Sequence, residues 1–320
     1  MKAVVIREFG PPGVLRLEDV PGPSAGQAQV VIDVAFASIT FVETQVRAGR
    51  PPSKAMLPAL PAILGNGVGG TVTQAGEGAR PGLLGQRVVA ALGGKGGYAE
   101  EAAAAAAGVI EVPDGLELRE ATALLADGRT ALGLTELAGP GSGDTVLVEA
   151  AAGGVGTLLV QFARNAGARV VALAGGERKL AVARDLGADL VVDYRDAGWP
   201  SRVREAAGKV DVVFDGVGGE IGAAAFALLG AGGRYLPFGA AGGAFAPIDR
   251  ELAWERDVAV VSPGPPTPAE SRRRIEDALD AAAAGTLRPL IGHRLPLTEA
   301  AEAHRAIEAR ETIGKTLLIP

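Results

Sequence analysis

The sequence contains no cysteine, only two histidines and few aromatic residues, 4% of the chain. The absence of cysteine excludes disulfides, thiolate nucleophiles and cysteine-ligated zinc sites. The formal net charge is −6, and no extended basic patch indicates a nucleic-acid partner. One basic triplet, Arg272–Arg274, stands among acidic residues in a helical pattern, so we interpret it as a solvated helix face.

Long apolar runs are also missing. No stretch approaches the roughly 18 apolar residues of a membrane span, and the apolar run at the N-terminus, Ala3–Ile6, is too short for a signal peptide. The sequence therefore predicts a cytoplasmic protein without a membrane partner. Its 320 residues suit two domains, and its 48% of hydrophobic residues are enough for sizeable cores.

The N-terminal third of the chain has the pattern of a β-rich domain. Short apolar runs alternate with glycine and proline turns, which is typical of strands in a small, irregular barrel. The expected strands are Ala3–Arg7, Val14–Val20, Gln29–Ser38, Gly69–Gln74, Gln86–Leu92 and Tyr98–Glu101.

From Asp144 onward, strands alternate with segments of helix length. Strands such as Arg169–Ala174 are largely apolar, as expected for strands buried on both faces. Strands joined by helices predict a doubly wound parallel sheet with helices on both faces. The tail shows mixed structure, and its periodicity leaves open whether it folds back on the first domain. The elements expected in it are Pro268–Ala284, Arg288–Ile291, Leu297–Arg310 and Thr316–Ile319.

The segment Ala150–Gly156 follows a strand and opens a helix. In that context glycines let the backbone approach a pyrophosphate, and the helix N-terminus offers free N–H donors. Ala151 stands where the first glycine of G-x-G-x-x-G would be, so the loop is a variant of the dinucleotide fingerprint; the alternative is a tight turn that serves packing alone. A literal G-x-G-x-x-G at Gly65–Gly70 leads into a strand, so we do not expect it to bind a nucleotide.

The end of the second strand indicates which dinucleotide is bound. The strand runs into Gly175 and Gly176 without the acidic residue that commonly holds the ribose 2′-hydroxyl of NAD. Lys179 follows, and a cation pairs with the 2′-phosphate of NADPH. The residues therefore favour NADPH. Glu177 disagrees with this interpretation, and Lys179 has the alternative of a solvated residue in the first turn of a helix.

Further motifs stand in a definite order along the chain: Gly97–Glu100, Gly128–Ala131, Ala151–Gly156 with Gln161, Leu186–Asp189, Asp193–Arg195, Phe214–Gly219 and Gly314–Lys315. Together they resemble the zeta-crystallin-like quinone oxidoreductases, which are zinc-independent members of the medium-chain dehydrogenase/reductase superfamily. The resemblance covers nearly the whole chain. It implies an α/β protein with a GroES-like β-rich catalytic domain, residues 1–118 and 263–320, and an inserted NADPH-binding Rossmann domain, residues 119–262.

The resemblance also implies roles for single residues. Lys179 and Tyr194 would flank the adenosine 2′-phosphate, Thr130 would lie near the nicotinamide, and Lys315 would reach the cofactor from the tail. The alternatives are a half-buried strand-end position for Tyr194, a helix-interior position for Thr130 and an exposed strand position for Lys315. The expected cofactor-binding residues are Thr130, Gly153, Gly154, Val155, Gly156, Gly175, Lys179, Tyr194, Phe238, Gly239, Ala240 and Lys315.

No metal site is expected. Zinc-bearing relatives use cysteine and histidine ligands, including a Gly-His-Glu motif, where this chain has Asn66 between two glycines. His293 and His304 lie in the tail, and neither is expected to be catalytic. The expected substrate is a small molecule that is already activated, a quinone or an α,β-unsaturated carbonyl, which accepts hydride at carbon while the protein positions it and solvent supplies the proton. No catalytic residue is assigned.

The expected substrate pocket departs from that of the family, which often has Asn-Pro-x-Glu-Thr-Tyr where this chain has Thr40–Gln45. Thr40 replaces the asparagine, Gln45 replaces the tyrosine, and a second tyrosine is absent after Gly49. We expect Thr40, Phe41 and Gln45 to bind substrate, with plain packing as the alternative, and Glu43 to be structural. The loss of two aromatic walls weakens the case for stacking a quinone ring and favours an aliphatic enone or an enoyl thioester.

Other functions stay open on the sequence alone. One is an enoyl or enone reductase of a biosynthetic pathway, and another is an NADPH-binding protein with little turnover, since retained cofactor residues stand beside altered pocket residues. A one-electron quinone reductase, which makes semiquinones, is a third. The resemblance implies a homodimer through edge strands near Val258–Val261.

Overall fold

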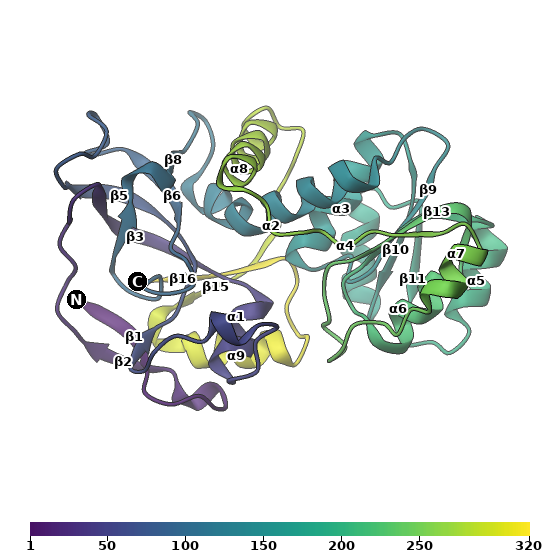
Figure 1. Ribbon diagram of the computed structural model, residues 1–320, viewed down its shortest axis with the longest axis horizontal. Coiled ribbons are helices and arrows are strands. Elements are labelled where there is room, and N and C mark those ends of the chain that lie inside the picture. Colours follow the sequence, from purple (N-terminus) through teal and green to yellow (C-terminus); the bar gives the residue numbers. More distant parts are fainter. The chain divides into compact units, whose positions relative to one another are not determined.

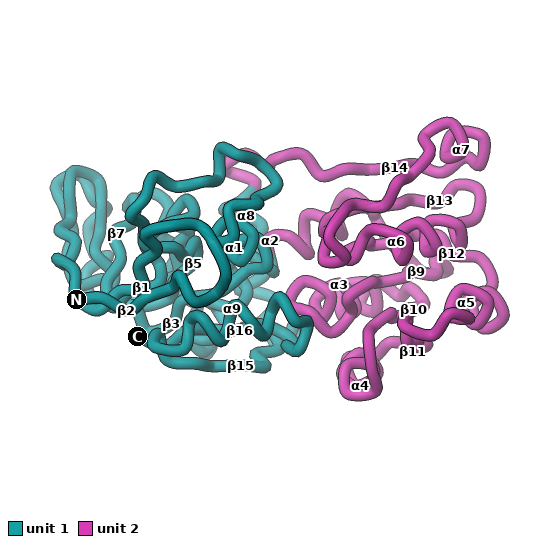
Figure 2. Tube along the Cα trace, turned by 90° about the horizontal axis from the view of Figure 1, so that it is seen from below, with its two compact units in different colours: residues 1–128, 271–320 teal, residues 129–270 magenta.

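The computed structural model describes residues 1–320, and the chain forms two compact units (Figure 2). Unit 1 comprises residues 1–128 and 271–320, and unit 2 comprises residues 129–270. Both ends of the chain therefore belong to unit 1, and unit 2 is an insertion. The divisions fall at residues 128/129 and 270/271, whereas the sequence placed them at 118/119 and 262/263. The first lies inside helix α2, Leu118–Ala138, which the sequence patterns did not delimit.

Unit 1 contains two sheets, in purple, blue and yellow in Figure 1. The smaller is antiparallel, in the order β2-β1-β4. The larger has the order β15-β16-β3-β5-β6-β8, and β7 also pairs with β3. The strands are β1 (Lys2–Ile6), β2 (Arg16–Asp19), β3 (Gln29–Ile39), β4 (Ala62–Ile63), β5 (Gly67–Ala75), β6 (Arg87–Ala91), β7 (Glu101–Ala105), β8 (Val109–Glu111), β15 (Ile291–Pro296) and β16 (Lys315–Ile319).

The long strand β3 organises unit 1 because it pairs with β5, β7 and β16. Val30, Ile32 and Val34 on β3 lie in a core shared with Val68 on β5 and Val88 on β6. The return of the tail therefore completes this sheet through β16. The helices of unit 1, besides the first part of α2, are α1 (Phe41–Arg47), α8 (Pro268–Ala283) and α9 (Ala300–Glu308).

Two of the expected strands lie elsewhere. The expected strand Tyr98–Glu101 is wrong in position: Tyr98 and Ala99 are buried outside the regular strand, and β7 is formed by the alanine run that follows Glu101. Alanine has low strand propensity, but Ala102 and Ala104 are buried against β3, so packing overrides propensity. In the tail, Arg288–Leu290 is not regular, and the strand begins at Ile291.

Unit 2 is a single six-stranded sheet in the order β11-β10-β9-β12-β13-β14, with every neighbouring pair parallel. Numbered from β9, the order is 3-2-1-4-5-6, the doubly wound arrangement of dinucleotide-binding domains. The strand order changes direction between β9 and β12. In doubly wound sheets ligands bind at this point, outside the carboxyl ends of the strands. The strands are β9 (Thr145–Val148), β10 (Arg169–Ala174), β11 (Leu190–Asp193), β12 (Val210–Asp215), β13 (Leu229–Pro237) and β14 (Ala259–Val260).

Helices connect these strands and pack against them, and the central strands β9, β10 and β12 are almost wholly buried. They are α3 (Gly154–Asn165), α4 (Glu177–Asp185), α5 (Trp199–Ala207), α6 (Gly219–Phe226) and α7 (Arg250–Glu255). The predicted α/β class, with a β-rich domain and a doubly wound parallel sheet, is confirmed. None of the helices has the length and apolar character that crossing a membrane would require.

Candidate functional site

The loop after β9 leads the chain directly into the first turn of α3. Ala150 adopts a positive φ of 47°, and the Ala151 N–H donates to the Leu173 carbonyl of the neighbouring strand at 3.0 Å. The Gly153 N–H donates to the Ala150 carbonyl at 2.8 Å, and Gly153 caps α3 in an extended conformation. The helix therefore starts at the carboxyl end of β9, where its free N–H groups and the positive end of its dipole can hold a phosphate.

The glycines of this loop are close to other backbone atoms. A Cβ on Gly156 would lie 2.2 Å from the Ala150 carbonyl oxygen, so no larger residue fits without moving the loop. Gly154 and Val155 form the half-buried first turn between them. The structure thus brings Gly153, Gly154, Val155 and Gly156 together in one turn that leaves the backbone accessible to a diphosphate. On this observation the loop fits a dinucleotide.

A second loop lies at the ends of β12 and β13, on the other side of the point where strand order reverses. The N–H groups of Phe238 and Gly239 donate to the Asp215 carbonyl at 2.9 and 3.2 Å. A Cβ on Gly216 would meet the Phe238 ring at 2.7 Å. Phe238, Gly239 and Ala240 are half-buried, and they are held against the end of β12. They therefore stand at the carboxyl edge of the sheet, where cofactor contacts were expected.

The ends of β10 and β11 form the third part of the site. The Tyr194 hydroxyl lies 3.2 Å from the position that a Gly175 Cβ would take. Lys179 is half-buried in the first turn of α4, and its N–H donates to the Gly176 carbonyl at 3.0 Å. The structure therefore places Gly175, Lys179 and Tyr194 at the same corner of the sheet. A small residue at the strand end leaves room there for a phosphate on the ribose.

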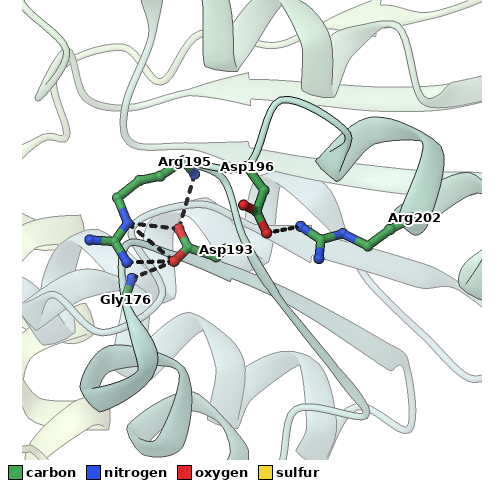
Figure 3. A network of polar contacts seen from close by, with 5 residues as sticks. All are labelled: Gly176, Asp193, Arg195, Asp196 and Arg202. Atoms are coloured by element: carbon green, nitrogen blue, oxygen red, sulfur yellow. Dashed lines mark hydrogen bonds and ion pairs between the residues drawn. The ribbon is translucent and has the colours of Figure 1, made fainter.

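Arg195 joins this corner, although the sequence analysis gave it no role. Its guanidinium donates to the Asp193 carboxylate, with Nη2 to Oδ2 at 2.6 Å, and the same carboxylate accepts the Gly176 N–H at 3.0 Å (Figure 3). This pairing lowers the pKa of Asp193 to about 2. The side chain of Arg195 is 63% exposed, so it can turn toward a ligand. The signal for it was the motif Asp193–Arg195, which was used only for recognition of the family.

Glu177, the residue that disagreed with NADPH, pairs along its own helix. Its Oε1 lies 3.4 Å from Nη1 of Arg184, and both side chains are largely exposed. Glu177 lines the same hollow as Asp193 and Arg195, and within it the Glu177 carboxylate pairs with a cation of α4. Its pairing with Arg184 offsets the charge that would oppose a 2′-phosphate at this corner.

Two further expected cofactor residues lie outside these loops. Thr130 is half-buried inside α2, which fits the helix-interior position given as its alternative. Lys315 is not an exposed strand residue: only 4% of its side chain is exposed, and its Nζ donates to Asp127 Oδ1 at 2.9 Å. Both members of this pair belong to unit 1. Whether either residue contacts the cofactor stays a prediction.

The expected substrate residues cluster at α1 in unit 1. Thr40 precedes the helix, and its N–H and hydroxyl both donate to Glu43 Oε2, at 2.5 and 2.9 Å. Glu43 Oε1 accepts the Asn66 N–H at 2.7 Å. Glu43 is buried and holds the N-terminus of α1, as its structural role requires. Phe41 and Gln45 are half-buried on the same helix, and Gln45 Nε2 donates to Thr44 Oγ1 at 3.1 Å.

Glu43 nevertheless keeps an unusual electrostatic environment. Burial raises its pKa, whereas hydrogen bonds from Thr40 and Asn66 and the charge of Lys315 act in the opposite direction. These donors stabilise the charged form of the Glu43 carboxylate. Both of its oxygens are already engaged with them, so neither is left to bind a substrate.

The tail histidine His304 is part of the interior of unit 1. Its Nε2 lies 3.1 Å from the Tyr98 hydroxyl, and both rings are fully buried. Burial lowers the pKa of His304 to about 3, with a smaller contribution from the charge of Arg47. A neutral, enclosed imidazole of this kind packs the core.

Two negative observations complete the site. No three His, Cys, Asp or Glu side chains are grouped as ligands of a metal ion. The literal G-x-G-x-x-G segment enters strand β5, where Cβ atoms on Gly69 and Gly70 would lie 1.9 Å from Thr122 Oγ1 and 2.0 Å from the Asp33 carbonyl. These glycines serve close packing in unit 1.

Comparison with known proteins now identifies the family. Residues 26–114 match the alcohol dehydrogenase GroES-like domain, and residues 154–280 match the zinc-binding dehydrogenase family. The chain is 32% identical to a quinone oxidoreductase of Rattus norvegicus, over 100% of this chain and 98% of that protein. The chain belongs to the zeta-crystallin-like quinone oxidoreductases of the medium-chain dehydrogenase/reductase superfamily. The resemblance predicted from the motifs is thereby confirmed.

Two other similar proteins bear on the chemistry. A 2-haloacrylate reductase of Burkholderia sp is 31% identical, over 99% of this chain and 98% of that protein. A mycobacterial protein solved as a complex with NADPH is 35% identical, with a TM-score of 0.88 and full coverage of both chains. The proteins to which this chain is similar are therefore named both for quinones and for a haloacrylate.

Proposed function

We propose that this protein is an NADPH-dependent oxidoreductase that reduces a quinone or an α,β-unsaturated carbonyl compound. The observation that carries the proposal is the carboxyl edge of unit 2. There, a glycine turn opens α3, and the end of β10, which carries no acidic residue, has Lys179, Tyr194 and Arg195 nearby. This combination suits a diphosphate and a ribose 2′-phosphate. The structure solved with NADPH, named above, supports the same cofactor.

Bound NADPH supplies a hydride. The first turn of α3, from Gly153 to Gly156, would hold the diphosphate through backbone N–H groups. Lys179, Tyr194 and Arg195 would bind the 2′-phosphate, and Phe238, Gly239 and Ala240 would lie along the nicotinamide ribose. Arg195 would exchange its bond to Asp193 for one to the phosphate, at little cost because its side chain is largely exposed.

The acceptor is inferred from what α1 offers. The Thr40 hydroxyl donates its proton to Glu43, and Glu43 is saturated with donors, so neither is a ready proton source for a substrate. The half-buried Thr40, Phe41 and Gln45 would bind and orient the acceptor. A compound whose double bond is already polarised by a carbonyl needs only this, because the charge that develops after hydride transfer is delocalised to oxygen and solvent can supply the proton.

A second substrate class has specific support. Tyrosine is absent from the segment around α1, and one similar protein is a 2-haloacrylate reductase, named for a substrate with an activated double bond. An enone or enoyl compound would require no aromatic wall. A protein that binds NADPH with little turnover would share the cofactor corner but would fail with every acceptor.

The test is NADPH oxidation by the purified protein, followed by absorbance with four acceptors: a benzoquinone, phenanthrenequinone, an aliphatic enone and a crotonyl thioester. Turnover of the quinones supports the proposal in its first form. Turnover of the enone or thioester alone moves the substrate to activated double bonds. Tight NADPH binding, measured by fluorescence titration, together with no turnover of any acceptor would contradict an enzymatic role.

We further propose a cytoplasmic homodimer that assembles through unit 2. β14 is the last strand of its sheet and so leaves one edge unpaired. Near it, Trp254 is 86% exposed and Phe245 is 57% exposed, so two large apolar residues are available for burial at an interface. Sedimentation of the wild-type protein and of Trp254→Glu tests this; a monomeric wild-type protein contradicts it.

A further inference from the structure

A buried pair of carboxyl groups lies at the carboxyl ends of β9 and β12, and the proposed reaction does not use it. Glu149 directly follows β9, Asp215 ends β12, and both side chains are completely buried. Glu149 Oε2 accepts the Val217 N–H at 3.2 Å, while the buried Oε1 has no hydrogen-bond partner. A buried oxygen without a donor is costly for a carboxylate, which points to a proton on this group.

The second carboxyl group, Asp215, has its donors in place. Its Oδ1 accepts the N–H groups of Val217 and Gly218 at 2.9 and 2.6 Å, and its Oδ2 accepts the Tyr235 hydroxyl. Two adjacent buried carboxylates cannot both carry a charge, so one of them keeps a proton. We place this proton on Glu149, because Asp215 accepts three hydrogen bonds that favour its charged form.

The surroundings of Glu149 agree with this placement. Burial, a hydrogen bond with Asp215 and the charge of Asp215 all raise its pKa well above the ordinary value, and only the Val217 N–H acts in the opposite direction. The other titratable side chain that interacts electrostatically with Glu149 is Tyr235 on β13. Its pKa is raised mainly by burial and, to a smaller extent, by its hydrogen bond with Asp215. Asp215 on β12 and Tyr235 on β13 are thus the groups that face Glu149 from neighbouring strands, and neither offers a positive charge.

The pair joins the loops that follow β9 and β12. Glu149 immediately precedes Ala150, where the glycine turn starts, and it contacts the loop after β12 through Val217. The backbone carbonyl of Asp215 holds Phe238 and Gly239, so the loop after β13 is tied to the same point. The ends of β9, β12 and β13 are therefore connected through the hydrogen bonds of this pair.

We propose that Glu149 is a positioning residue for NADPH: as a neutral carboxylic acid it ties the glycine turn to the loop after β12, and its ionisation weakens NADPH binding. Ionisation would place a second negative charge beside Asp215 and below the turn that receives the diphosphate. Repulsion would then both separate the loops and disfavour the anionic cofactor. This inference rests on the proposed function, because NADPH binding is its readout.

The test is the Kd for NADPH as a function of pH, measured by fluorescence titration for wild type, Glu149→Gln and Glu220→Gln. Glutamine keeps the shape of a neutral acid and its donor but cannot ionise. Glu220 is an exposed acid in the first turn of α6 and controls for removal of a charge in unit 2. In wild type and Glu220→Gln, the Kd should rise at alkaline pH by up to about tenfold per pH unit. In Glu149→Gln the Kd should stay at the value that wild type shows before this rise.

Titration of the cofactor's own 2′-phosphate affects all three proteins alike and cancels in the comparison. An alkaline rise of the same size in Glu149→Gln and wild type, or no rise in wild type, would overturn the inference. Wild type that binds no NADPH at any pH would instead overturn the proposed function, and the inference with it.

If Glu149→Gln does not fold, a second variant tests the same inference. Asp215→Asn removes the neighbouring charge but keeps an oxygen that can accept the loop N–H groups. Glu149 should then ionise more easily, so the rise in Kd should move to lower pH by at least about one unit, since a nearby like charge commonly raises a carboxyl pKa by this much. An unshifted profile would overturn the inference.

Discussion

The polar side chains expected at the cofactor and those around α1 differ in burial. In unit 1, Lys315 pairs with Asp127 in the interior, the buried Glu43 holds the start of α1, and His304 is a neutral core residue. At the carboxyl edge of unit 2, by contrast, Arg195 and Lys179 remain partly exposed at the ends of strands. The comparison teaches that burial, and not residue type, separates the charges that stabilise this protein from those that can bind a ligand.

The largest effect is expected for the pair Asp127 and Lys315. Asp127→Ala would leave a buried ammonium without its partner, which costs about 3–5 kcal/mol. Urea unfolding should show this loss of stability. The control is Asp277→Ala, which breaks an exposed pair with Arg273 on α8 and should leave stability nearly unchanged. A small loss of stability in Asp127→Ala combined with a large loss of NADPH affinity would assign Lys315 to the cofactor. It would contradict the view that the buried charges of unit 1 serve stability alone.

The next largest effect on stability is a pH dependence that we expect from His304. Its folded-state pKa of about 3 lies below the ordinary value of 6.5, so the unfolded chain takes up a proton first as pH falls. The contribution of His304 to the free energy of unfolding is therefore present above pH 6.5 and is lost on acidification. The loss should be about 2–3 kcal/mol between pH 7 and pH 4.5. Unfolding of wild type and His304→Gln at the two pH values measures this contribution. An equal loss in both proteins would show that other groups cause it.

In unit 2, Gly156→Ala tests the close approach at the glycine turn. The new Cβ would lie 2.2 Å from the Ala150 carbonyl oxygen, so the turn must shift, at a cost of about 1–3 kcal/mol. We expect NADPH affinity to fall strongly as well. Gly198→Ala is the matched control in unit 2, because its φ of −85° suits alanine and no atom lies within 4 Å of the new Cβ. Equal losses of NADPH affinity in the two variants would contradict the assigned geometry.

A smaller and more selective effect is expected for Arg195→Ala. Loss of one charge-assisted hydrogen bond to a phosphate should raise the KM for NADPH about tenfold. The KM for NADH, which lacks the 2′-phosphate, should not change, and neither should stability. Arg202→Ala, which breaks an exposed pair with Asp196 in the same region, is the control (Figure 3). Equal changes with NADH and NADPH would show that Arg195 does not contact the 2′-phosphate.

Much of unit 2 could be predicted from the sequence because its signals are local. Apolar strands with glycine at their ends predicted β9, β10 and the start of α3 closely. Unit 1 was harder, because the alanine strand β7 forms only through pairing with β3, and the tail completes the sheet from far along the chain. The contacts of Lys315 with Asp127 and of Glu149 with Asp215 join distant segments, so no periodicity could reveal them.

The measurement that tests the central claim most directly is the ratio of kcat/KM for NADPH to that for NADH, with a benzoquinone or the best acceptor of the panel. If Lys179, Tyr194 and Arg195 bind the 2′-phosphate, the ratio should favour NADPH by at least about tenfold, the worth of one charge-assisted hydrogen bond. A ratio near one, or a preference for NADH, would contradict the account of this corner of unit 2.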